Sequence, residues 1–424
     1  MVSIKISIIG TGYVGLVSAG CFAKLGHKII CVDIDSNILD KINRGISPIY
    51  EKDLDEILSK NLDRIQATGN YEKAICSSDI TFICVGTPSK KNGEIDLSYL
   101  KKSSEQIGKI LKDKESWHLV VVKSTVLPGT TRDVVLPILE KASGKKAGID
   151  FGIAMNPEFL REGVAVSDFL NPDRIVIGSS DKKSKKTLKK LYNGFKCQIF
   201  ETSLSAAEMI KYASNCFLAT KISYINEIGN MCKKLEIDTY EVADGMGLDS
   251  RIKRDFLNSG IGWGGSCFPK DVKALEFWAK KQNLDTEIID SVIRVNNKQP
   301  LKVLELLKKH IKDINGKTIG ILGLAFKSDT DDIRESRTIP IVRSLIEKGA
   351  YVKVYDPKAM DNFKKIFPDL IYCSSAEEVL DSDVVIIATV WDSFKNLDYS
   401  NSIVIDGRKL KQAKKAKVYE GVCW

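Results

Sequence analysis

Cys267 lies in the segment GIGWGGSCFPKD, in which glycines precede the thiol and a Pro-Lys-Asp triplet follows it. Glycines let the backbone approach a bulky group closely, because they have no side chain and tolerate a positive φ. Pro269 suits the first position of a helix, which would continue through residues 272–280. Cys267 would then lie just outside a helix N-terminus, where the dipole favours the thiolate over the thiol. The segment predicts a presented nucleophile, although a helix-capping loop with an inert cysteine explains it equally well.

Two further pairs of polar side chains have a spacing that suits catalysis. Lys211 and Asn215 are four residues apart in a long helical pattern and share one helix face, and Cys267 and Asp271 have the same separation. An ammonium and an amide on one face can stabilise an oxyanion. A surface lysine beside an asparagine is the commoner explanation of such a pair, and the sequence leaves both open.

Two loops after predicted strands carry side chains that can bind or activate a water molecule. Glu158 and Glu162 lie in NPEFLREG, and Thr125 lies in KSTVLPGT. Ligands bind at the carboxyl ends of the strands of a parallel sheet, so a carboxylate there can assist the attack of a water that the threonine hydroxyl holds. The alternative for the glutamates is a solvated polar loop.

Gly10, Gly12 and Gly15 form GTGYVG between a predicted strand and a predicted helix, and Asp33 ends the next strand. This pattern is typical of a dinucleotide site, in which the acidic residue bonds the adenosine ribose. A carboxylate there repels a 2′-phosphate, so the pattern predicts NAD rather than NADP. The cofactor accepts hydride, whereas a thiolate attacks carbonyls and not alcohols. Together they predict oxidation of an alcohol to an aldehyde, then of a thiohemiacetal to a thioester, and hydrolysis to an acid.

The elements that must position these residues fall into three segments. Residues 1–202 alternate short apolar strands with helical patterns, which predicts a parallel, doubly wound NAD-binding domain that DRIVIGSS extends. Residues 203–310 carry no strand signal, begin with a long helix free of proline, and contain Lys211 and Cys267. Residues 311–424 repeat the first pattern of strands. The predicted fold class is α/β, with two Rossmann-like doubly wound domains joined by a long central helix and a helical domain.

Composition restricts the class of protein. The 424 residues are 43% hydrophobic and 28% charged, and the net charge of +9 is spread in lysine pairs rather than gathered in a basic arm. This is typical of a globular protein without a nucleic-acid partner, and a mild positive field suits an anionic small molecule. No apolar run approaches the length of a membrane span. Ten cysteines without a C-x-x-C pair, and three scattered histidines, indicate a reducing cytoplasm and no metal site.

Eight motifs extend in order over nearly the whole chain: GTGYVGL, CVGTP, KSTVLPGT, NPEFLREG, EMIKYASNCFLATKISYINE, GGSCFPKD, GLAFKSDTDDIRES and DGR. Through them the sequence resembles the nucleotide-sugar 6-dehydrogenases of the UDP-glucose/GDP-mannose dehydrogenase family. The resemblance implies NAD as cofactor, a helical dimerisation core in the middle segment, and a C-terminal domain that holds the UDP. It also implies a cytoplasmic homodimer that oxidises UDP-glucose to UDP-glucuronate by four electrons.

The resemblance further implies roles for individual residues. Cys267 would be the nucleophile, with Lys211, Asn215 and Asp271 in oxyanion and water-activating roles, Glu158 assisting thioester hydrolysis and Thr125 ordering the water. The implied NAD contacts are Gly10, Gly12, Val14, Gly15, Asp33, Thr87, Thr125, Glu162, Lys270 and Arg334. The implied substrate contacts are Glu158, Phe159, Leu160, Arg161, Glu162, Lys211, Asn215, Phe256, Leu257, Asn258, Ser259, Gly260, Gly264, Lys327 and Arg408, with Arg251 reaching the neighbouring subunit's site.

Two departures from the family pattern and several alternatives accompany this prediction. Trp263 stands where Phe or Tyr is usual, which bears on the sugar, and Ile38 replaces a basic residue often found after the ribose-binding Asp, which bears on NAD. GDP-mannose is an alternative substrate, and UDP-N-acetylmannosamine is a weaker one, because its enzymes usually carry a His before the cysteine. A two-electron hydroxyacid dehydrogenase and a nucleotide-sugar-binding sensor are alternative classes, but neither needs Cys267, Lys211 and Asp271 together.

Overall fold

The structure is a computed structural model that describes residues 3–90 and 92–424. The chain divides into two compact units, Met1–Ala213 and Ser214–Trp424, and the boundary falls within the longest helix, α9 (Leu204–Lys234). The division into three domains expected from the sequence stays a prediction, because these two units group the central helices with the C-terminal sheet.

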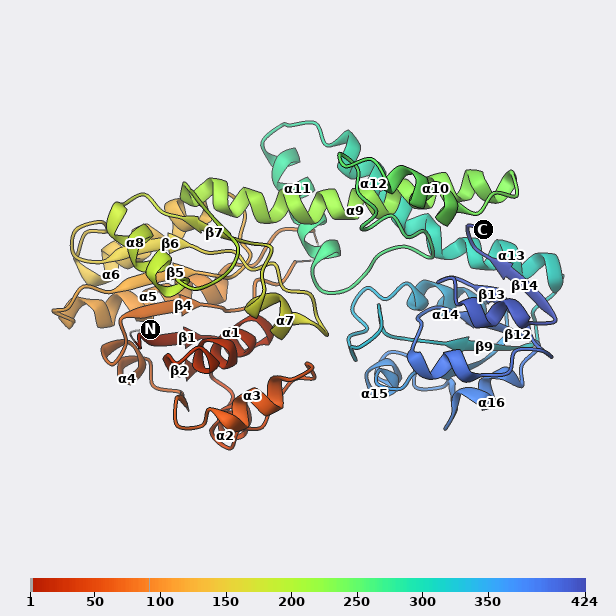
Figure 1. The fold of residues 1–424 in the computed structure, drawn as a ribbon, viewed down its shortest axis with the longest axis horizontal. Coiled ribbons are helices and arrows are strands. Elements are labelled where there is room, and N and C mark those ends of the chain that lie inside the picture. Colours follow the sequence, from red (N-terminus) through yellow and green to blue (C-terminus); the bar gives the residue numbers. More distant parts are fainter. Residues whose placement is uncertain (1–2, 91) are drawn as a thin grey trace. The chain divides into compact units, whose positions relative to one another are not determined.

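The first unit is built on an eight-stranded sheet in the order β3-β2-β1-β4-β5-β6-β7-β8 (Figure 1). Its strands are β1 (Lys5–Ile9), β2 (Lys28–Val32), β3 (Ile65–Thr68), β4 (Ile80–Ile83), β5 (Leu119–Val122), β6 (Gly152–Met155), β7 (Arg174–Gly178) and β8 (Gln198–Thr202). Its helices are α1 (Tyr13–Lys24), α2 (Ser36–Asn43), α3 (Leu54–Lys60), α4 (Tyr71–Cys76), α5 (Ser98–Asp113), the π-helical turn η1 (Thr131–Val135), α6 (Leu136–Ser143), α7 (Ala165–Leu170) and α8 (Lys182–Leu191).

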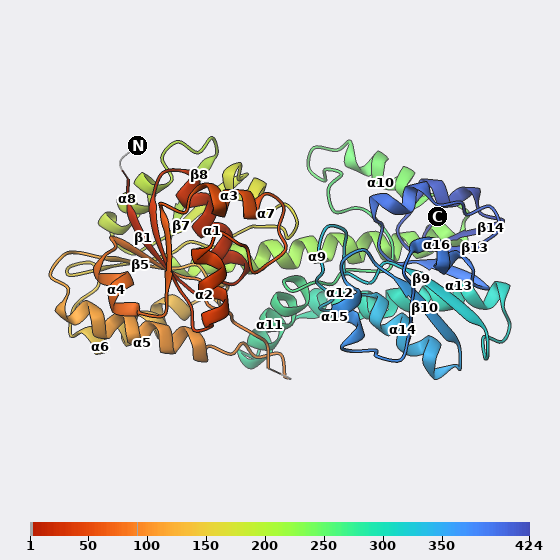
Figure 2. The same cartoon turned by 90° about the horizontal axis from the view of Figure 1, so that it is seen from below.

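Both faces of this sheet are covered by helices, as its continuous apolar strands require. In β5, Leu119 and Val121 pack in one core, together with side chains of α1 and α3, while Val120 and Val122 pack in the other, with side chains of α5 and α6. Figure 2 shows α5 and α6 on one face of the sheet and α1 and α3 on the other. Because β1, β4, β5 and β6 run parallel to one another, their carboxyl ends lie along one edge of the sheet, where the loops that follow them meet.

Two strands, β7 and β8, run against the prediction of a wholly parallel sheet. The pairing of β6 with β7 is antiparallel, through Met155 and Gly178, whereas β7 and β8 are parallel to each other. The connection after β6 is held at the carboxyl edge, because Glu51 accepts hydrogen bonds from the backbone of Gly163 and Ala165. The chain therefore re-enters the sheet from that edge. The sequence also did not single out the edge strands β3 and β8, whose polar residues interrupt the apolar run.

The second unit opens with helices. Besides the rest of α9, they are α10 (Thr239–Gly247), α11 (Phe268–Lys281), α12 (Glu287–Lys298), the 3₁₀ turn η2 (Gln299–Leu301) and α13 (Lys302–His310). Helix α9 has 31 residues, which corresponds to about 46 Å of helix. The predicted absence of strands in this segment agrees with the element order found there.

The second unit ends in a six-stranded, wholly parallel sheet with the order β11-β10-β9-β12-β13-β14, so the α/β class with two Rossmann-like sheets is confirmed. Helices α13 and α14 lie on one of its faces and α16 on the other (Figure 1). Its elements are β9 (Thr318–Leu322), α14 (Thr338–Glu347), β10 (Tyr351–Tyr355), α15 (Met360–Lys364), β11 (Ile371–Tyr372), α16 (Ala376–Leu380), β12 (Val384–Ile387), η3 (Asp392–Asn396), β13 (Ile403–Asp406), η4 (Lys411–Lys415) and β14 (Val418–Gly421).

The second sheet repeats the first down to its acidic residue, but uses that residue differently. Asp356 follows β10 as Asp33 follows β2. Its carboxylate is 1% exposed and accepts hydrogen bonds from the backbone of Leu324 and Ala325 and from the indole of Trp391. The carboxylate thus holds the glycine turn together, and the indole occupies the place beside it.

Candidate active site

The three glycines of the first turn serve two different purposes. Gly10 has a φ of +90°, and a Cβ on Gly15 would lie 1.9 Å from the carbonyl oxygen of Gly10. Both positions therefore exclude any side chain. A Cβ on Gly12 would meet no heavy atom within 4 Å. Gly12 is the N-cap of α1, so this open space lies before a helix N-terminus, which suits the pyrophosphate of a dinucleotide. Val14 lies in the first turn of the same helix.

Asp33 is fixed directly beside this turn. Its Oδ2 accepts hydrogen bonds from the backbone N–H of Thr11 at 2.8 Å and from its hydroxyl at 2.5 Å, and its Oδ1 accepts from Ile34 and Asp35. Partial burial would raise the pKa of Asp33, but these hydrogen bonds together hold it below its ordinary value. An ionised, half-buried carboxylate keeps lone pairs for a ribose hydroxyl. The residues present therefore fit NAD. Ile38 packs against the core below.

The loops after β4 and β5 are joined at two of the implied cofactor contacts. The hydroxyl of Thr87 donates to the carbonyl oxygen of Thr125 at 2.8 Å. The hydroxyl of Ser124 donates to the carbonyl oxygen of Val85 at 2.6 Å. Thr125 is half-buried, so its side chain is held at the carboxyl edge of the sheet without being sealed in the core.

Glu158 and Lys211 form a buried ion pair. Lys211 Nζ lies 2.9 Å from Glu158 Oε1, and the side chains are 4% and 6% exposed. Burial would raise the pKa of Glu158, but Lys211, the backbone N–H of Leu160 and the nearby Lys123 outweigh it and hold that pKa below its ordinary value. The surface-lysine explanation of Lys211 and the solvated-loop explanation of Glu158 are therefore wrong. The structure brings these two predicted residues together.

The other residues of NPEFLREG have different surroundings. The guanidinium of Arg174 lies 3.9 Å from the ring centre of Phe159. Arg161 forms a bidentate ion pair with Asp168, with a shortest contact of 2.6 Å, and this pair fixes the loop backbone. Glu162 is half-buried in the same loop.

Cys267 is the N-cap of α11, as the sequence predicts, and Pro269 is the second residue of that helix. The thiol is half-buried and lies 3.5 Å from the hydroxyl of Ser266. One turn later, Asp271 is 1% exposed and accepts a 2.6 Å hydrogen bond from the side-chain amide of Asn215. Lys270 forms an ion pair with the same carboxylate. Three implied site residues, Asn215, Lys270 and Asp271, thus form one cluster.

The glycines before Cys267 approach the chain's own backbone. A Cβ on Gly260 would lie 2.5 Å from the carbonyl oxygen of Gly407, and one on Gly264 would lie 2.2 Å from that of Glu335. Asn296 secures the loop between them, because it accepts from Trp263 N and donates to Trp263 O. These contacts lock the loop against the carboxyl edge of the second sheet. The indole of Trp263 is buried and donates to the hydroxyl of Ser223 at 2.9 Å. Trp263, which stands where the family usually has Phe or Tyr, is therefore a core residue.

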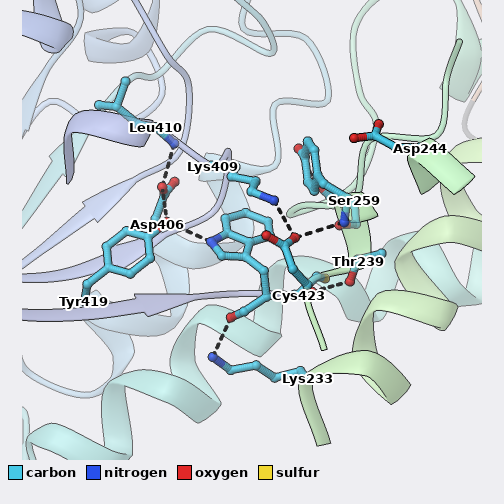
Figure 3. Close-up of polar contacts among 12 residues, drawn as sticks. Lys233, Thr239, Asp244, Ser259, Asp406, Lys409, Leu410, Tyr419 and Cys423 are labelled. Carbon is cyan, nitrogen blue, oxygen red and sulfur yellow. Dashed lines mark hydrogen bonds and ion pairs between the residues drawn. The ribbon is translucent and has the colours of Figure 1, made fainter. Parts of the chain in front are cut away.

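The predicted substrate loop of residues 256–260 is strained at its start and pinned at its end. Phe256 has a φ of +63°, which is rare for a bulky side chain and is typical of functional loops. Leu257 and Ser259 are buried, and Asn258 is exposed. Asn226 accepts a 2.8 Å hydrogen bond from the backbone of Gly260. Figure 3 shows Ser259 near Thr239 and Cys423, where the end of the chain packs.

The basic residues implied for the substrate differ in environment. Arg408 is half-buried and donates to the carbonyl oxygens of Ala388 and Gly262, and desolvation lowers its pKa to about 10. Lys327 is half-buried beside the ring of Phe326. Arg251 is 86% exposed and pairs with Asp249. Arg334, an implied cofactor contact, pairs with Asp332, and its carbonyl oxygen accepts from Gly265 N.

Sequence reasoning gave no role to Lys123 or Glu208, both of which are buried. Glu208 accepts hydrogen bonds from the backbone of Gly129 and Thr131, so it anchors the loop that follows Thr125. The sequence feature that could have indicated a role for Glu208 is its position one turn before Lys211 on α9. For Lys123 the signal was its place directly after the apolar strand β5.

In the described part of the chain, no group of three or more His, Cys, Asp or Glu residues is arranged to hold a metal ion. None of the helices described in residues 3–90 and 92–424 combines the length and apolarity that a membrane span needs.

Three sequence models of the UDP-glucose/GDP-mannose dehydrogenase family match the chain. The model of the NAD binding domain matches residues 4–196, that of the central domain residues 205–298, and that of the UDP binding domain residues 320–413.

Individual relatives are similar over their full length. The UDP-glucose 6-dehydrogenase of Haloferax volcanii is 44% identical, covering 99% of this chain and 100% of that protein. The structure of a UDP-glucose dehydrogenase from Pyrobaculum islandicum is 42% identical, with a TM-score of 0.96, over 100% of this chain and 98% of that one. The GDP-mannose 6-dehydrogenase of Pseudomonas syringae is 38% identical, covering 99% of this chain and 100% of that protein.

Proposed function

Because the chain belongs to the UDP-glucose/GDP-mannose dehydrogenase family and is an NAD-dependent oxidoreductase, we propose that it oxidises UDP-glucose to UDP-glucuronate through a thioester on Cys267. The observation that carries the proposal is the buried pair of Lys211 and Glu158 at the carboxyl edge of the NAD-binding sheet. A buried ion pair is costly to maintain, so its presence at a ligand-binding edge favours a catalytic role over a stabilising one.

When bound, NAD would supply the hydride acceptor, one molecule for each of the two oxidations. During the first oxidation, the ammonium of Lys211 would stabilise negative charge on the substrate oxygen as the alcohol loses its proton to solvent water and its hydride to the cofactor. Cys267 Sγ then adds to the aldehyde carbon and forms a thiohemiacetal. Loss of the second hydride to a second cofactor molecule, and of the hydroxyl proton to solvent water, would turn this into a thioester.

Hydrolysis completes the proposed cycle. A water held by Thr125 attacks the thioester carbon while Glu158 accepts its proton. The C–S bond breaks, and the thiolate of Cys267 is released with the carboxylate product. The cluster of Asn215 and Asp271 supports this step, because the 2.6 Å hydrogen bond between them fixes an amide one helical turn from Lys211.

UDP-glucose is the substrate that the relatives favour, since curated enzymes at 42–44% identity carry that name. Two phosphates require cations, and Lys327, Arg408 and Arg251 are the proposed sources. GDP-mannose is the second candidate, because a GDP-mannose 6-dehydrogenase is 38% identical over 99% of the chain.

We also propose a homodimer formed along α9. Phe217, Tyr224 and Met231 recur every seven residues on this helix and are 64%, 49% and 54% exposed. Seven residues are close to two turns, so the three side chains lie in one apolar stripe. In such a dimer the exposed Arg251 would serve the neighbouring subunit's site.

Ten free cysteines suit a reducing cytoplasm.

The decisive experiment is the ratio of NADH formed to UDP-glucose consumed. Oxidation of a primary alcohol to a carboxylate removes four electrons, so two NADH are expected for each sugar. A two-electron hydroxyacid dehydrogenase gives one, and a sensor gives none. Cys267→Ser is the matched variant: it should fold and bind NAD but form no acid, because a hydroxyl is a far weaker nucleophile. One NADH per sugar, with free aldehyde, would reject the thioester route. Faster turnover of GDP-mannose than of UDP-glucose would make GDP-mannose the assigned substrate.

A further inference from the structure

Lys123 is a fully buried lysine that no step of the proposed reaction uses. It follows β5 directly, is 4% exposed, and donates from Nζ to the side-chain oxygen of Asn156 at 3.0 Å. Asn156 follows the neighbouring strand β6, and its backbone N–H donates to Val122 O at 2.9 Å. The lysine is thus built into the carboxyl edge of the sheet, two residues before Thr125 and beside the strand that leads to Glu158.

The orientation of Asn156 is fixed. Its side-chain nitrogen donates to Val176 O at 2.8 Å, and its oxygen accepts from both Lys123 and the hydroxyl of Tyr192, the latter at 2.6 Å. The amide oxygen therefore faces Lys123. The ring of Phe82 lies 5.9 Å from Nζ, which adds a favourable contact for a cation.

The ionisable groups whose charges act on Lys123 are Cys84, Glu158 and Lys211, and Tyr192 shares with Lys123 the side-chain oxygen of Asn156. Burial raises the pKa of Cys84 to about 12 and also raises that of Tyr192, so both are neutral at neutral pH. Burial lowers the pKa of Lys123; Cys84 and the charge of Glu158 oppose that fall, and Lys211 adds to it. At neutral pH Glu158 is therefore the anion of this set. It contacts Lys211 directly at 2.9 Å, and it follows Asn156, the hydrogen-bond partner of Lys123, by two residues.

We propose that Lys123 is a positioning residue whose ammonium keeps Glu158 ionised when Lys211 serves the substrate. The inference rests on the proposed function for what Lys211 and Glu158 do. When the ammonium of Lys211 turns to an oxyanion, a buried carboxylate with no other counter-charge would take up a proton and lose its capacity as a base. Lys123 supplies the second positive charge, so the same pair can serve oxidation and then hydrolysis.

The first test is the pH profile of turnover in Lys123→Met. Without the ammonium, Glu158 becomes protonated at higher pH, so the acid limb should move up by about one pH unit. Lys123→Arg keeps the charge and should keep the limb. Lys114→Met is the matched control: Lys114 is also buried, but it donates to the carbonyl oxygens of Ile75, Cys76 and Ser78. That variant should lose stability without moving the limb, and an equal shift in it would overturn the proposal.

The second test does not need activity, so it separates this proposal from the proposed function. With ¹³C-labelled glutamate side chains, and Glu158→Gln to assign the signal, the carboxyl of Glu158 can be titrated directly. In Lys211→Met it should still be ionised at neutral pH, because Lys123 remains. Adding Lys123→Gln, which keeps a hydrogen-bond donor, should raise the midpoint. A midpoint near or above neutrality in Lys211→Met alone would overturn the proposal even if no Lys123 variant folds.

Discussion

Asp406 shows how a single residue can govern the stability of the second unit. It is fully buried at the end of β13 and accepts hydrogen bonds from the backbone of Arg408 and Leu410 and from the hydroxyl of Tyr419 (Figure 3). Burial outweighs these hydrogen bonds and raises its pKa to about 6. The charge therefore costs more in the folded protein than in the unfolded chain.

The sign of the resulting pH dependence follows from that shift. An unfolded aspartate titrates near 3.9, so the folded state binds this proton more tightly. The stability that the proton contributes is present below about pH 4 and is lost as the pH rises to about 6, by roughly 3 kcal/mol. Urea unfolding of the wild type and of Asp406→Asn from pH 4 to 7 measures it. The variant stays neutral, so it should lack this part of the slope, and its stability relative to the wild type should be higher at pH 7 than at pH 4. Parallel curves for the two proteins would contradict the prediction.

At the scale of elements, the loop before α11 decides where Cys267 lies. Its glycines contact the backbone of the second sheet, so the thiol is positioned by that sheet as well as by its own helix. A helix N-terminus alone would present a cysteine, but would leave its distance to a substrate carbon open.

Gly264→Ala tests this positioning. The new Cβ would lie 2.2 Å from Glu335 O, so the loop must shift. A displacement of about 1 Å at a reacting group can cost on the order of 100-fold in rate, and turnover should fall by roughly 10- to 100-fold. Gly245→Ala is the control, because its Cβ would meet nothing within 4 Å and lies in helix α10, where it should be neutral or slightly stabilising. Steady-state rates and melting temperatures measure both variants. Normal turnover in a folded Gly264→Ala would show that the loop is not positioned in this way.

At the scale of the whole molecule, the apolar stripe on α9 predicts assembly. Burial of Phe217, Tyr224 and Met231 against a second copy would remove the largest regular row of exposed apolar side chains on that helix. Tyr224→Glu should therefore shift the sedimenting species from dimer to monomer, because an unpaired charge in an apolar interface is costly. Turnover should fall with it if Arg251 completes the neighbouring site. Ile149→Glu, at a 75% exposed residue of the first unit, is the control and should remain dimeric. A wild type that sediments as a monomer would reject the dimer.

The sequence by itself determined the fold class, because strand runs such as LVVV, the glycine turn GTGYVG and the proline-free helix from residue 204 follow local rules of period and φ. It also placed Cys267 at a helix start and named Lys211 and Glu158. Only the tertiary structure decided which surroundings those residues receive. Glu158 meets Lys211 from 53 residues away, Asn215 meets Asp271 from 56 residues away, and β7 runs antiparallel to β6. The glycines before Cys267 face backbone, and Lys123 is buried beside Asn156. Local pattern fixes the conformation of a segment, whereas burial, charge partners and strand direction depend on segments that meet only when the chain has folded.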